Sequence, residues 1–210
     1  MNRIARKLGL AAGALVVSAS AASAQVSYFT TGMFTGCNVG SPAGSCLIGS
    51  GTDIATLSFA GAGTAAFPVS FGTPISGATL GTFTLSSAGT GTTNFSFAGV
   101  GFQLTINQTA PTSQTAMPSA TITGSFQQNP IQGGPVTLSF ASPTFLIGPA
   151  IYSIVQGSAL PIRLPSTGGA GQVTDLQANI NVVPEPSTYA LLATGIAGLG
   201  LVARRRRSAV

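Results

Sequence analysis

Between residues 25 and 183, only Asp53, Arg163 and Asp175 carry a formal charge. A glycoside hydrolase needs two carboxyl groups, one acting as acid and the other as base or nucleophile. Asp53 and Asp175 are therefore the pair that a polysaccharide hydrolase would have to use. The chain has no histidine, and this region has no lysine, so no serine there has either partner for activation. We expect no enzymatic activity. Asp53 is expected to begin a strand, and Asp175 to be a solvent-facing residue of another strand.

Cys37 and Cys46 are the two cysteines of the chain. In an oxidising compartment, such a closely spaced pair predicts a disulfide across a flexible loop. A structural metal site would need further ligands, and histidine is absent. A calcium site would need clustered carboxylates, which the sequence also lacks. We expect no metal and no cofactor.

Aromatic side chains beside amides suit glycan binding, and Tyr28 and Tyr152 are the tyrosines of residues 25–183. Both fall in segments where apolar and polar residues alternate, as in a half-buried strand. The alternation favours core packing for both rings. Glycan binding therefore remains an alternative function, and neither tyrosine is assigned to a glycan-binding site.

Alternation of apolar and polar residues recurs along residues 25–182 and is clearest from Phe102 to Asn107. Pro68 interrupts an alternating segment, which indicates an edge strand or a bulge. The last such segment runs from Val173 to Val183. Turn residues separate the segments, and no 3.6-residue period is present. The pattern predicts an all-β ectodomain, a single β-sandwich or barrel-like fold of about nine to eleven short antiparallel strands.

The N-terminus has the features of a secretory signal peptide over residues 1–24. A basic stretch precedes the apolar run at 8–17, and the small residues Ala22 and Ala24 mark a cleavage site. Cleavage there would leave Gln25 as the first residue of the exported protein.

The C-terminal segment, residues 183–210, combines a proline-rich turn, an apolar run and a basic cluster. The apolar run at 188–203 predicts a transmembrane helix of ~24 Å, shorter than the ~30 Å hydrocarbon core. Positive charges stay on the cytoplasmic side, so the ectodomain would lie outside. The turn consists of Val183, Pro184, Glu185, Pro186 and Ser187, and the basic cluster of Arg204, Arg205, Arg206 and Arg207.

This three-part tail resembles the PEP-CTERM sorting signal of exopolysaccharide-producing Gram-negative bacteria. The resemblance implies that an exosortase recognises Pro184, Glu185 and Pro186 and cuts the tail. It implies a precursor exported by the secretion translocon and held transiently in the inner membrane. The protein would then reach the outer surface or extracellular matrix, where exopolysaccharide is its expected partner.

The formal net charge of +5 comes from the targeting segments, which hold seven of the eight basic residues. Residues 25–183 have one arginine and two aspartates, giving 1 − 2 = −1, so nucleic-acid binding is excluded as a function. We expect a non-catalytic exported protein of the cell surface or exopolysaccharide matrix. A glycan-binding adhesin is the alternative, and a hydrolase using Asp53 and Asp175 the less favoured one.

Overall fold

A computed structural model describes residues 24–38, 40–69, 74–183 and 193–200. The described residues form sixteen strands and one short helix at 193–200. The strands are β1 (Ala24–Thr35), β2 (Ser45–Ser50), β3 (Asp53–Gly61), β4 (Ala65–Val69), β5 (Ile75–Ala88), β6 (Asn94–Ser96), β7 (Val100–Ala110), β8 (Gln114–Ala116), β9 (Ser119–Thr123), β10 (Ser125–Gln127), β11 (Gln132–Gly133), β12 (Val136–Phe140), β13 (Thr144–Ile147), β14 (Ala150–Ile154), β15 (Ala159–Ile162) and β16 (Gln172–Val182).

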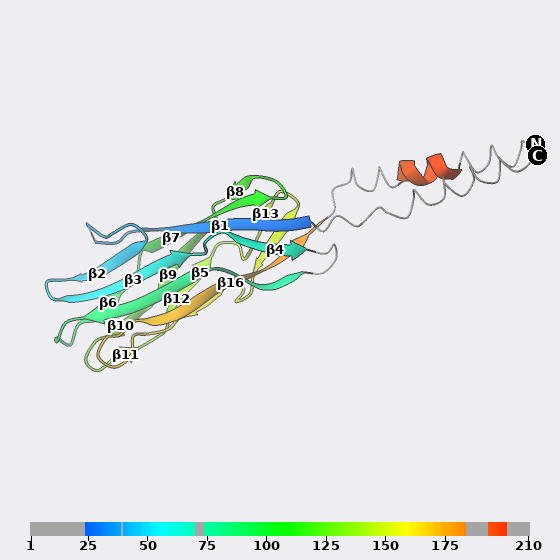
Figure 1. Cartoon of the computed structure of the whole chain (residues 1–210). Coiled ribbons are helices and arrows are strands. Elements are labelled where there is room, and N and C mark those ends of the chain that lie inside the picture. The colour runs from blue at the N-terminus through cyan, green and yellow to red at the C-terminus, as the bar shows by residue number, and fades with distance from the viewer. Residues whose placement is uncertain (1–23, 39, 70–73, 184–192, 201–210) are drawn as a thin grey trace, which may run out of the picture.

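Two large antiparallel sheets make up the fold (Figure 1). The β1 sheet has the strand order β15-β12-β9-β7-β1-β4, with β8 also paired to β7. The β5 sheet has the order β13-β14-β16-β5-β3-β2. A small third sheet, β11-β10-β6, completes the structure. The all-β prediction is thus confirmed.

The alternation seen in the sequence determines which face of each strand is buried. In β7, Phe102, Leu104 and Ile106 are buried, whereas Gln103 and Thr105 point outward. Because side chains alternate with a period of two, a one-residue slip would bury the polar set. The apolar pattern therefore fixes the register of β7 against β1 and β9.

Phenylalanine rings join the two large sheets in one core. Phe34 and Phe102 come from the β1 sheet, and Phe59 and Phe83 from the β5 sheet. The Phe102 ring centroid lies 5.0 Å from those of Phe34 and Phe59 and 4.9 Å from that of Phe83. Gly32 makes room for this cluster, since a Cβ there would overlap the rings of Phe59 and Phe102. Tilted and edge-on ring packing of this kind adds to simple area burial.

One part of the predicted architecture differs from the structure, and another lies partly outside the described residues. The strand count exceeds the nine to eleven expected, because strands as short as β6, β8 and β11 contain too few residues to show a period. Of the helix predicted over 188–203, residues 193–200 are described, and they are helical and exposed. Among the described residues, no helix has both the length and the apolar character needed to cross a membrane.

The first strand begins and the last strand ends at the same end of the sandwich (Figure 1). β1 begins at Ala24, and β16 ends at Val182. The next residue is still tied to the fold, because the Val183 N–H donates to the Pro149 carbonyl at 2.9 Å. The segment predicted to act as a sorting signal therefore begins directly at this end of the sandwich.

Candidate functional site

Asp53, at the start of β3, is a structural anchor for the loop at 89–93. Thr93 Oγ1 donates to its Oδ2 at 2.7 Å, and the Gly91 N–H donates to its Oδ1 at 3.3 Å. The Thr93 hydroxyl, followed by the Gly91 N–H, lowers the pKa of the Asp53 carboxyl. A Cβ at Gly89 or Gly91 would overlap the carboxylate, so the loop backbone closes around it. These contacts give the Asp53 carboxylate a structural role in holding the loop.

Asp175 lies on β16, exposed and far from Asp53. β5 separates them, because it pairs with β3 on one side and with β16 on the other. Asp175 stands opposite Thr82, whereas Ile54, the neighbour of Asp53, stands opposite Ala88. Six residues along β5 correspond to ~20 Å, while the two carboxyl groups of a glycosidase lie roughly 5–9.5 Å apart. The structure therefore does not bring Asp53 and Asp175 together as the carboxyl pair that the hydrolase alternative needs.

Tyr28 and Tyr152 are core residues, as the alternation favoured. Both side chains are fully buried, and their rings meet edge to face with centroids 6.0 Å apart. The Tyr28 hydroxyl donates to the Thr79 carbonyl, and the Tyr152 hydroxyl donates to Gln108 Oε1, each at 2.9 Å. These rings join the β1 and β5 sheets and offer no surface to a glycan.

The buried tyrosines predict a loss of stability at alkaline pH. Burial raises the pKa of Tyr28 to about 12, from an ordinary value of 10.0. The pKa of Tyr152 is raised too, by burial and then by the charge of Tyr28. The unfolded chain ionises first, so this contribution is present below pH 10 and is lost as the pH rises towards 12.

Urea unfolding at a series of pH values measures this effect. We expect the midpoint of the wild type to fall above pH 10 and that of the double variant Tyr28→Phe/Tyr152→Phe to fall less steeply. Parallel curves for the two proteins would show that the buried phenols do not control the alkaline transition.

The predicted disulfide between Cys37 and Cys46 is present, with the two Cα atoms 5.2 Å apart. It closes a loop that lies along the outer edge of β2. The Asn38 N–H donates to the Leu47 carbonyl at 3.0 Å, and Ser41 Oγ accepts from the Leu47 N–H at 3.1 Å. The Asn38 side-chain amide donates to the Gly49 carbonyl at 2.6 Å. Because β2 is an edge strand, the loop blocks pairing with another chain.

Removing the disulfide with Cys37→Ser/Cys46→Ser should lower the free energy of unfolding by about 2–3 kcal/mol, the loop-closure value for a separation of nine residues. Urea unfolding with and without reductant measures this. Reductant should destabilise the wild type and leave the double variant unchanged. Labelling of both cysteines as free thiols in native protein would contradict the pairing.

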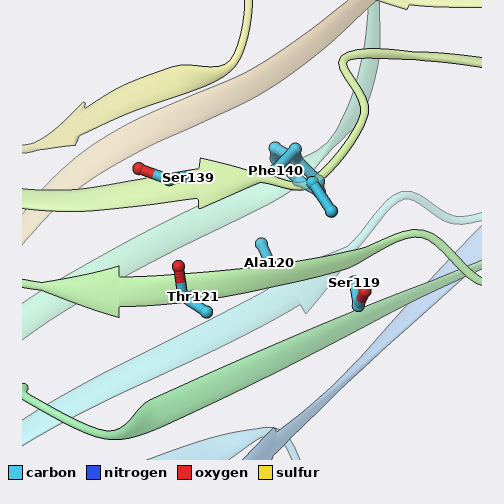
Figure 2. A pocket seen from close by; sticks show the side chains of 6 residues that line it. Ser119, Ala120, Thr121, Ser139 and Phe140 are labelled. Atoms are coloured by element: carbon cyan, nitrogen blue, oxygen red, sulfur yellow. The ribbon is translucent and has the colours of Figure 1, made fainter.

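Hydroxyl and amide groups cover the outer face of the β1 sheet. Across the strands, Ser139 stands opposite Thr121 and Thr137 opposite Thr123. Figure 2 shows Thr121 on β9 beside Ser139 on β12, at a hollow of about 230 Å³ lined by Ser119, Ala120, Thr121, Ser139, Phe140 and Ala141. None of the strands of this sheet contains Asp, Glu, Lys or Arg.

Phe29 and Met33 stand out on this polar face, with 38% and 56% of their surface exposed. Sequence reasoning considered Tyr28 and passed over its neighbour. The same alternation that buries Tyr28 in β1 must turn Phe29 outward, so the signal was present in the sequence.

Most of the predicted targeting residues lie outside the described residues. The ones that lie outside are Ala22, Pro184, Glu185, Pro186, Ser187, Arg204, Arg205, Arg206 and Arg207. At the predicted signal-cleavage point, Ala24 and Gln25 are the first residues of β1, opposite Val69 and Pro68. Val183, the first residue of the predicted sorting motif, is 47% exposed. Within the described ranges, no three His, Cys, Asp or Glu residues come together as a metal site.

Comparison with known families identifies the C-terminal segment. Residues 182–207 match the family model of the PEP-CTERM protein-sorting motif. No curated protein and no solved structure matches the chain. The match begins at the last residue of β16, so the sorting motif directly follows the final strand of the fold. The chain therefore carries a signal for exosortase-type sorting of an exported protein.

Proposed function

We propose that this protein, an exported chain with a PEP-CTERM motif, is a non-catalytic component of the cell surface or exopolysaccharide matrix. The observation that carries the proposal is the outer face of the β1 sheet, which bears hydroxyl and amide groups on strands without a charged residue. Such groups form many weak hydrogen bonds with a hydrated neutral polymer. Long-range electrostatic steering contributes little, since residues 25–183 have a net charge of 1 − 2 = −1.

Delivery would follow from the two ends of the chain. The signal peptide brings the chain to the secretion translocon, and the helix proposed over 188–203 holds the precursor in the inner membrane. The exosortase then removes the tail, and the protein reaches the outer surface or matrix of a Gram-negative cell. The start of β1 and the end of β16 lie at one end of the sandwich, so the opposite end would point away from the membrane (Figure 1).

Fractionation of a producing culture tests this role. The protein should co-purify with the extracellular polysaccharide and remain bound to it when the salt concentration is raised from about 0.1 M to about 1 M. This change shortens the electrostatic screening length from ~10 Å to ~3 Å. Release by salt would contradict neutral association.

A depolymerisation assay on the producer's own polysaccharide addresses turnover. We expect none. Cleavage that is abolished by Asp53→Asn or Asp175→Asn would show that the protein is a hydrolase. Cleavage that survives both changes would also contradict the non-catalytic role, with other residues responsible.

A further inference from the structure

Two apolar side chains lie beside two amides on the outer face of the β1 sheet. In the pairing of β1 with β7, Phe29 stands opposite Asn107 and Met33 stands opposite Gln103. Four residues along the strand separate the two pairs, a distance of ~13 Å. We call these two pairs, with Thr31 between them, the Phe29 strip.

The amides of the strip have hydrogen-bonding capacity to spare. Asn107 Oδ1 accepts from Thr115 Oγ1 at 3.0 Å, and the Asn107 side-chain N–H groups donate to no other described residue. Within the described part of the chain, the Gln103 amide makes no side-chain hydrogen bond. Both amides therefore face solvent with donors, and in Gln103 also an acceptor, available to a ligand.

The backbone of the strip is held in place because it belongs to paired strands. β1 is bonded to β7 from Ser27 to Thr35, and β7 is held on its far side by β8 and β9. A ligand would meet a backbone that is already positioned, so little ordering of the main chain opposes binding.

Charge restricts the ligand class. The strands of the β1 sheet contain no acidic or basic residue, so nothing on them complements a phosphate, a uronate or a cationic peptide. An exposed ring covers the C–H face of a sugar, while adjacent amides exchange hydrogen bonds with its hydroxyl groups. The ligand that matches uncharged donors and acceptors beside an exposed ring is a neutral polysaccharide.

We propose that the Phe29 strip binds a neutral polysaccharide chain lying along β1 and β7, with one contact at Phe29 and Asn107 and a second at Met33 and Gln103. The inference rests on the proposed matrix role and names the surface and the chemistry of its partner.

Affinity electrophoresis of the full-length protein in gels containing neutral or uronic-acid polysaccharides tests the assignment. Wild-type protein should be retarded by a neutral polysaccharide and not by alginate. Phe29→Ala/Asn107→Ala should weaken the binding about tenfold, and Phe29→Tyr should retain it. Val173→Ala is the matched control, since Val173 is 51% exposed on β16 in the other sheet.

Three results would overturn the assignment. The first is that no neutral polysaccharide retards the wild type, and the second is that the strip variant and the Val173→Ala control are retarded equally. The third is that the wild type forms a dimer that dissociates on Phe29→Ala, which would mean that the strip binds a second copy of the chain.

Culture fractionation separates the two proposals. If the strip variant co-purifies with the matrix as well as the wild type does, the strip assignment fails. If the wild type itself does not co-purify, the proposed function fails.

Discussion

The Phe102→Ala variant should lose about 3–5 kcal/mol of its free energy of unfolding. Phe102 is 2% exposed and packs against one ring from its own sheet and two from the β5 sheet. Shortening it removes the buried ring and leaves a cavity that paired strands on both sides cannot readily close. Urea unfolding followed by far-ultraviolet circular dichroism measures the loss.

Met33→Ala is the control, because Met33 lies on the same sheet with 56% of its surface exposed. Its cost should stay within about 0.5 kcal/mol. If Phe102→Ala does not fold, Phe102→Leu provides a milder test of the same contact. A cost for Phe102→Leu no larger than that of Met33→Ala would contradict the central position of this ring cluster.

Replacing Pro184, Glu185 and Pro186 together with alanine should abolish C-terminal processing. The motif lies within the segment that matches the sorting family, directly after the last strand of the fold. Without the recognition element, full-length protein should accumulate in the membrane fraction. Immunoblotting of membrane, surface and medium fractions measures the distribution.

Asp175→Ala gives a matched control, since it removes an exposed acidic side chain ten residues before Glu185 and outside the matched segment. This variant should be processed and distributed like the wild type. Processing of the triple alanine variant at the wild-type level would show that the tripeptide is not the recognition element.

The local sequence predicted those strands in which the alternation of apolar and polar residues extends over enough residues to be recognised. The alternation from Phe102 to Asn107 lies within β7, and the segment predicted from Val173 to Val183 corresponds to β16. Pro68 indicated an edge strand or a bulge, and β4 is indeed the last strand of the β1 sheet. In β7 and β16, apolar residues at alternate positions indicate a strand. In β4, the proline lacks a backbone N–H, which indicates an edge position.

Pairing between distant strands could not be predicted in this way. The separation of Asp53 from Asp175 depends on the registers of β3 and β16 on the two sides of β5, which no local pattern encodes. The pairing of Phe29 with Asn107 is equally non-local, because the two residues are brought together by the β1–β7 register. The exposure of Phe29 was predictable from its neighbour Tyr28, whereas its amide partner was not.

The measurement that tests the central claim most directly is the intact mass of the protein recovered from the surface or matrix of exosortase-competent cells. An exported PEP-CTERM substrate should begin at Gln25 and have lost the chain after the sorting motif, including Arg204 to Arg207. A mature species that still carries the four arginines and remains in the membrane would contradict the account.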